Sequence, residues 1–159
     1  MNKLSDLKQF VRWQKPIIRK ARICLGLCIH RDMSPETFYS ITSTIVCPDP
    51  IFSVRMERGD ALIERSRSIL ATKFFNDNLE DILLFVDDDI IFQPEDAIKI
   101  ANCIYKEGLD IVGGAYVTKS EGQAELQQKI YKEQEIILSP NSKPVETRNV
   151  STGFLAISR

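Results

Sequence analysis

The sequence predicts a three-layer α/β/α fold built around a mostly parallel sheet. Short apolar runs of strand length alternate with amphipathic segments at helical spacing, in the order strand, helix, strand, helix, strand, helix, strand. The run at 82–86 is apolar at every position, which is typical of a strand covered on both faces. Alternation of this kind favours right-handed crossovers and a parallel sheet between two helical layers.

The chain divides into a lead-in segment and one domain. Residues 1–20 predict an amphipathic helix, because Leu4, Leu7 and Val11 recur at helical spacing. Residues 21–159 form the α/β domain. A chain of 159 residues buries enough surface to fold around an ordinary hydrophobic core, without disulfide or zinc support.

The first half of the domain contains two predicted strands, at 22–29 and 51–56. A helix follows the first strand, with Ser34 as its N-cap, and a longer helix at 60–75 follows the second. The residues expected to face the core are Phe38, Ile41 and Ile45 in the first helix, and Leu62, Ile63, Ser66, Ile69, Leu70 and Phe74 in the second.

The second half begins with the strand at 82–86. A helix starts near Pro94, and strands follow at 110–117 and 149–158, with the segment 130–138 as an extra strand or hairpin. The residues expected to face the core from the helix are Ala97, Ile98, Ala101, Ile104 and Tyr105. Because the last apolar strand runs to the final residue, we expect the domain to be shortened at its carboxyl end.

Composition excludes several classes of protein. Basic and acidic side chains nearly balance, at 21 and 22, which gives no broad electrostatic footprint for nucleic acid. The apolar runs fall far short of the roughly 20 residues that span a bilayer. The segment 1–20 lacks the continuous apolar core of a secretory signal, so a cytoplasmic location is predicted. The four cysteines form no CxxC pair and are predicted to be free thiols.

Ligands of open parallel sheets bind beyond the carboxyl ends of the strands. Three stretches qualify: His30–Asp32, Asp87–Asp89 and 113–119, which holds two glycines, Tyr116 and Lys119. His30 is the only histidine, which excludes a multi-histidine metal site. The glycine pair indicates either a close approach to a ligand or close packing of strand and helix.

The aspartate triplet carries the clearest chemistry. In an extended chain Asp87 and Asp89 point to one side and Asp88 to the other. Like charges about 4 Å apart repel by about 4 kcal/mol at an effective dielectric near 20, so the pair calls for a cation or a proton. Oxygen ligands suit Mg²⁺ or Mn²⁺. Helix capping is the alternative, but the helix signal begins about five residues later, at 93–95.

Four stretches together resemble a known group of enzymes. They are RSRSILATKFF, ILLFVDDDIIFQPED, DIVGGAYVTK and NVSTGFLAISR, in that order. This arrangement resembles the nucleotide-binding half of GT-A fold glycosyltransferases related to glycosyltransferase family 2, and it covers about residues 22–159. The resemblance implies a GT-A, Rossmann-like domain at 21–159 and identifies Asp87–Asp89 as the DxD motif.

The resemblance also assigns roles. Asp87 and Asp89 would hold Mn²⁺ or Mg²⁺, and Asp87 would also contact the ribose of a nucleotide-diphosphate sugar. Arg65 or Arg67 would face the nucleotide, although Ser66 stands where the family usually has Asn, and the flank of the helix could equally be solvated. The residues implied in donor binding are His30, Arg31, Arg65, Arg67, Asp87, Asp88 and Gly153.

The implied function is transfer of the sugar to an acceptor hydroxyl on an unidentified glycan, lipid or protein. Inverting members of the group place their catalytic Asp or Glu after the strand that corresponds to 149–158, so the resemblance implies a donor-binding half without the base. A catalytically silent nucleotide-sugar-binding module or assembly partner is therefore an alternative, and the uncovered last strand favours an oligomer. A haloacid-dehalogenase-like phosphatase is a further alternative, with Asp87 as nucleophile, although Ile91 replaces its usual Thr or Val.

Overall fold

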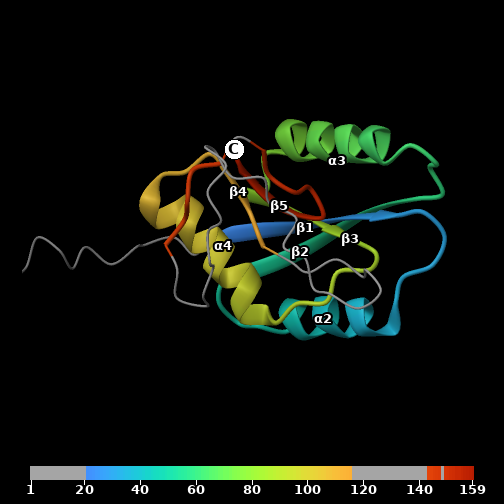
Figure 1. Cartoon of the computed structure of the whole chain (residues 1–159), viewed down its shortest axis with the longest axis horizontal. Coiled ribbons are helices and arrows are strands. Elements are labelled where there is room, and N and C mark those ends of the chain that lie inside the picture. Colours follow the sequence, from blue (N-terminus) through green and yellow to red (C-terminus); the bar gives the residue numbers. More distant parts are fainter. Residues whose placement is uncertain (1–20, 116–142, 148) are drawn as a thin grey trace, which may run out of the picture.

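A five-stranded mixed sheet with helices on both faces forms the framework of the chain (Figure 1). The structure is a computed structural model, and it describes residues 21–115, 143–147 and 149–159. The elements are β1 (Arg22–Ile29), α2 (Pro35–Ile45), β2 (Ile51–Arg58), α3 (Ile63–Asp77), β3 (Ile82–Asp87), α4 (Pro94–Glu107), β4 (Ile111–Gly113) and β5 (Phe154–Ser158). The helix predicted within 1–20, the strand predicted at 130–138, Tyr116 and Lys119 lie outside the described residues.

The strands are ordered β2-β1-β3-β5-β4. Strands β2, β1 and β3 run parallel, whereas β5 pairs antiparallel with both β3 and β4. The three-layer α/β/α prediction is confirmed. The sheet is mostly parallel, as predicted, because β2, β1, β3 and β4 share one direction, and it is mixed because β5 runs opposite to both of its neighbours.

Each face of the sheet has its own hydrophobic core. Helix α3 covers one face, and α2 and α4 cover the other (Figure 1). Because successive side chains of a strand point to opposite faces, β3 contributes Leu83 and Phe85 to the α3 side and Leu84 and Val86 to the other. The central position of β3 explains why its sequence is apolar at every position from 82 to 86.

Local signals set the starts of two helices as predicted. The Ser34 hydroxyl accepts a hydrogen bond from the Thr37 N–H at 3.0 Å, and Pro35 occupies the first turn of α2. In α4, the Asp96 carboxylate accepts from the Gln93 N–H at 2.9 Å. Helix α4 ends at Gly108, whose φ of 70° is a left-handed conformation that favours glycine.

Five predicted core residues are exposed: Phe38, Ile45, Leu62, Ile63 and Tyr105. In α2 the buried face is shifted by one position and consists of Thr37, Ser40, Ile41 and Thr44. Small polar residues can be buried there because their hydroxyls are bonded: Thr44 donates to the Ser40 carbonyl at 2.8 Å, and Ser40 accepts from the Phe92 N–H at 3.1 Å. The hydrophobic pattern alone therefore places the buried stripe wrongly.

Two predicted strands are shorter in the structure. The strand expected at 110–117 ends at Gly113, and the one expected at 149–158 begins at Phe154. Both neighbours of β5 end at this level, because Gly113 pairs with Leu155 and Val86 pairs with Phe154. Among the described residues, 149–152 therefore extend beyond the paired part of the sheet, and Gly153 is bonded to β3 through its carbonyl.

The glycine pair after β4 serves close packing. A Cβ atom on Gly113 would lie 2.0 Å from Val150 Cγ1, and one on Gly114 would lie 2.5 Å from Phe154 Cδ1 and 3.0 Å from Ile100 Cδ1. Each distance is shorter than a van der Waals contact. Of the two interpretations of this pair, the structure supports close packing, of Gly113 against the segment before β5 and of Gly114 against β5 and α4.

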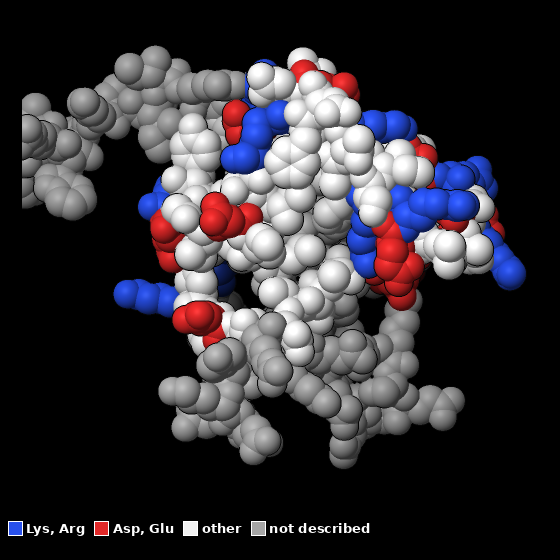
Figure 2. Space-filling view, turned by 90° about the horizontal axis from the view of Figure 1, so that it is seen from above, with Lys and Arg blue, Asp and Glu red and all other residues white. Residues whose placement is uncertain are grey.

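The surface of the described residues carries mixed charge. On the face shown in Figure 2, acidic and basic side chains lie beside one another around a mainly uncharged middle. Ion pairs among the described residues include Arg55 with Asp77 and Lys73 with Glu57. Among the described residues, none of the helices is long and apolar enough to cross a membrane.

We expect Leu70→Ala to lower the free energy of unfolding by about 2–5 kcal/mol, because Leu70 is fully buried between α3 and the sheet and its truncation leaves a cavity. The matched control is Leu62→Ala, because Leu62 is 57% exposed. Urea unfolding followed by circular dichroism measures both. Equal losses in the two variants would contradict the burial described here.

Candidate functional site

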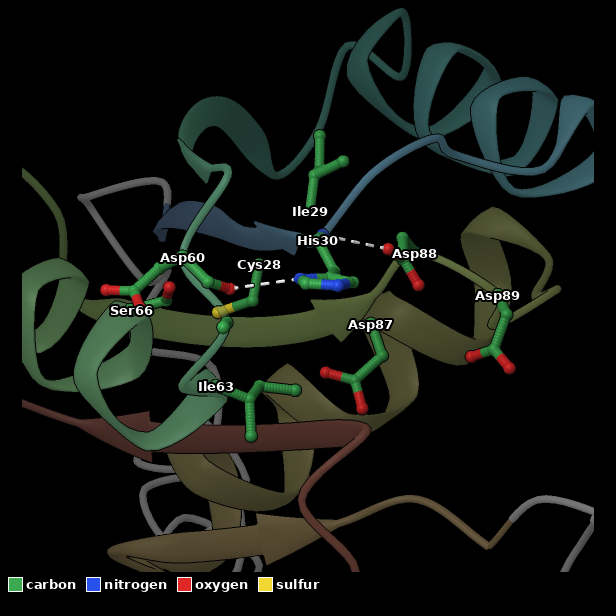
Figure 3. Close-up of a pocket in the computed structure, with 10 residues that line it drawn as sticks. Cys28, Ile29, His30, Asp60, Ile63, Ser66, Asp87, Asp88 and Asp89 are labelled. Carbon is green, nitrogen blue, oxygen red and sulfur yellow. Dashed lines mark hydrogen bonds between the residues drawn. The ribbon is translucent and has the colours of Figure 1, made fainter.

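The carboxyl ends of β1 and β3 and the loop after β2 lie at one edge of the sheet and border a pocket of about 260 Å³. Its wall comes from the ends of β1 and β3, the loop before α3 and the first turns of that helix (Figure 3). The lining residues are Cys28, Ile29, His30, Asp60, Ala61, Ile63, Ser66, Asp87, Asp88 and Asp89. This is the edge at which open α/β sheets bind ligands.

The aspartate triplet turns at the end of β3. Strand β3 ends at Asp87, and the Ile90 N–H donates to the Asp87 carbonyl at 3.2 Å, so the chain is no longer extended at Asp88 and Asp89. The carboxylates of Asp87 and Asp89 nevertheless lie on the same side of the chain, while Asp88 turns toward His30 (Figure 3). The turn thus produces the arrangement that simple strand alternation predicts.

Asp87 is held by two other elements. The Arg67 Nη2 of α3 donates to Asp87 Oδ1 at 2.6 Å, and both side chains are largely buried, with 16% and 23% of their surface exposed. The Asp87 N–H donates to the Gly153 carbonyl at 2.9 Å, which places the loop before β5 directly beside the triplet. The first aspartate is therefore fixed from both sides of β3.

Burial raises the pKa of Asp87 above its ordinary value. The Arg67 guanidinium opposes this rise through its charge and its hydrogen bond, while the neighbouring carboxylates of Asp89 and Asp88 add to it. A carboxylate under these opposing influences is the kind of perturbed group that gathers at functional sites.

Asp88 connects the triplet to β1 and α2. Its Oδ2 accepts from the His30 N–H at 3.1 Å, and its carbonyl accepts from the Ser34 N–H at 3.1 Å. The His30 ring lies near Asp60, with Nδ1 3.3 Å from the Asp60 carbonyl oxygen. These contacts position the His30 side chain at the pocket wall (Figure 3).

The loop after β2 contributes a residue that the sequence interpretation omits. Asp60 accepts from the Leu62 N–H at 3.0 Å and forms an ion pair with Arg65. The Arg65 hydrogen bond, followed by the Leu62 N–H, lowers the pKa of Asp60. Because Asp60 is polar and follows a strand end, the rule that selects His30 and Asp87 could have found it. Ser66, predicted to face the core, is buried and borders the pocket.

The structure brings together most, but not all, of the predicted site residues. His30, Asp87, Asp88 and Asp89 line the pocket. Arg67 and Gly153 reach Asp87 as described above. Arg31 and Arg65 do not line it: the Arg31 carbonyl accepts from Arg58, and the exposed Arg65 side chain pairs with Asp60.

The carboxylate oxygens of Asp87 and Asp89 suit a hard divalent cation whose remaining ligands come from elsewhere, such as phosphate or water. Among residues 21–115, 143–147 and 149–159, no group of three or more His, Cys, Asp or Glu side chains is arranged to hold a metal ion. Mg²⁺ and Mn²⁺ are commonly bound through only one or two carboxylates together with phosphate oxygens and water. Asp87 and Asp89 fit that requirement.

Fold and pocket together define a three-layer α/β protein whose pocket lies at the carboxyl ends of its parallel strands and is bordered by three consecutive aspartates. The sequence matches no known protein family and no curated protein sequence. Among solved structures, the chain is similar to the crystal structure of A197 from STIV, with a TM-score of 0.59 and 19% identity. The match covers 87% of this chain and spans 65% of the A197 chain. At this identity the likeness shows a shared fold.

Cys28 supplies a test of the pocket through pH. Burial raises the pKa of its thiol to about 11, with the Arg67 charge opposing that rise. Because the pKa of this thiol is higher in the folded chain than its ordinary value of 9.0, its contribution to stability is fully present below pH 9. That contribution is lost as the pH rises toward 11. We therefore expect the unaltered chain to lose more stability between pH 8 and 11 than Cys28→Ser, measured by urea unfolding. Parallel pH profiles would show that Cys28 is accessible to water.

Proposed function

We propose that the pocket binds a nucleotide-diphosphate sugar together with Mn²⁺ or Mg²⁺, as the donor-binding part of a glycosyltransferase. The observation that carries the proposal is the position of Asp87–Asp89 at the end of a buried central strand, where the triplet borders a pocket formed by the ends of β1 and β3, the loop after β2 and the start of α3. The three-layer α/β fold, with its pocket at the carboxyl ends of the strands, supports the proposal by analogy with the GT-A glycosyltransferases that the sequence motifs resemble.

Each part of the pocket has a role in this proposal. Asp87 and Asp89 would hold the cation, which would offset the negative charge of the diphosphate. His30, held by Asp88 and facing Asp60, would contact the nucleoside. The Gly153 loop, bonded to the Asp87 N–H, would lie beside the donor sugar.

A catalytically silent nucleotide-sugar-binding module is the second candidate. It is favoured by the engagement of three carboxylates that border the pocket: Asp60 pairs with Arg65, Asp87 pairs with Arg67, and Asp88 accepts from the His30 N–H. A general base requires a carboxylate oriented toward the proton that it removes. Binding without donor hydrolysis or sugar transfer would identify this candidate.

The test is the thermal unfolding midpoint of the chain with a panel of nucleotides and nucleotide sugars, each with and without Mn²⁺. A ligand at 100 times its dissociation constant adds about 2.7 kcal/mol, which corresponds to a shift of several degrees for a chain of this size. We expect a Mn²⁺-dependent shift for one nucleotide family and its loss in Asp89→Ala.

The control is Glu107→Ala, which removes an exposed carboxylate at the other end of α4 and should leave the shift unchanged. The absence of any nucleotide- and Mn²⁺-dependent shift in the folded, unaltered chain would refute the proposal. Phosphate release from a phosphomonoester, abolished by Asp87→Asn, would instead favour the phosphatase alternative.

A further inference from the structure

The Asp87 carboxylate already has a cation beside it. Arg67 donates to Asp87 Oδ1 at 2.6 Å, and the pair is largely shielded from solvent. A guanidinium from α3 thus reduces the repulsion among the three consecutive aspartates. Helix α3 directly precedes β3 in the chain and packs against it. The fold supplies this charge without a metal ion.

The contact leaves part of each group unused. The hydrogen bond to Asp87 uses one carboxylate oxygen, Oδ1. On the arginine, Nε is buried and has no hydrogen-bond partner among the described residues. The guanidinium therefore acts mainly as a positive charge beside one edge of Asp87, while the carboxylate still borders the pocket.

We propose that Arg67 is the resident counter-ion of Asp87 and that it competes with a divalent cation for this carboxylate. The inference rests on the proposed function, in which Asp87 and Asp89 hold the cation. A divalent ion on Asp87 would lie within a few ångströms of the guanidinium, and two positive charges so close in a partly buried site repel strongly. Arg67 therefore weakens the binding of a bare cation.

This arrangement favours a cation that arrives with an anion. The diphosphate of a donor carries negative charge that offsets both the metal ion and Arg67, whereas a free metal ion meets the guanidinium without compensation. The structure thus assigns Arg67 a role in selecting the metal-bound diphosphate over the free ion. Arg67 acts through Asp87 and is a positioning residue.

The decisive experiment measures Mn²⁺ binding alone, by titration calorimetry at pH 8. Arg67→Met retains an apolar side chain of similar length and removes the charge. We expect it to bind Mn²⁺ roughly tenfold or more tightly than the unaltered chain, because the repulsion is removed. Arg67→Lys retains the charge and should remain within about threefold of the unaltered chain.

The matched control is Lys73→Met. Lys73 lies on the same helix but pairs with Glu57, and its side chain is 54% exposed, so its loss should leave Mn²⁺ affinity within about threefold. Circular dichroism verifies that each variant is folded, and Arg67→Gln replaces Arg67→Met if the latter is not.

The outcomes separate the two proposals. Unchanged or weaker Mn²⁺ binding in folded Arg67→Met, with binding still lost in Asp89→Ala, would overturn the role of Arg67 and leave the metal site standing. If no Mn²⁺ binding is detected in the unaltered chain, in Arg67→Met or in Arg67→Gln, both the inference and the cation in the proposed function are overturned.

Discussion

Burial of β3 on both faces is the constraint on which the rest of the structure depends. Its apolar residues face α3 on one side and α2 and α4 on the other, so the strand lies at the centre of both cores. The polar triplet Asp87–Asp89 can begin only where the helices no longer bury both faces of the strand. Asp87 stands at that boundary, and its partial burial makes a charged partner necessary.

The ion pair of Arg67 with Asp87 meets that need and also joins α3 to the central strand. Around it, backbone hydrogen bonds connect Asp87 to Gly153 and Asp88 to Ser34, and the Asp88 side chain accepts from the His30 N–H. The pocket wall is therefore built from segments fixed by the main chain. A site that must hold a cation and a diphosphate benefits from such fixed positions, because little reorganisation is required on binding.

A second cluster of polar contacts, around Glu80, lies at the opposite end of the sheet. Glu80 is buried and accepts from Ser53 at 2.9 Å and from Arg55 at 3.0 Å, while the Arg159 guanidinium donates to the Glu80 carbonyl and stacks over Phe74. These contacts tie the start of β3 to the edge strand β2 and to the last turn of α3. Both ends of β3 are thus secured by charged groups, one beside the pocket and one remote from it.

The sequence by itself determined the alternation of strands and helices, the double burial of β3 and the helix starts at Ser34 and Gln93. These features depend on local hydrophobic period and on capping chemistry, which adjacent residues encode. It also identified Asp87–Asp89 as the acidic strand end, because an apolar run that stops at three carboxylates is visible in the chain.

Only the tertiary structure decided the antiparallel direction of β5, the exposure of Phe38 and Leu62, and which arginine meets the triplet. Arg65 and Arg67 are both candidates on the flank of one predicted helix. Their different partners, Asp60 and Asp87, follow from the rotation of α3 about its axis when Leu70 and Phe74 pack on the sheet. Contacts between residues far apart in the chain depend on that rotation, and the local pattern does not specify it because several rotations bury similar apolar area.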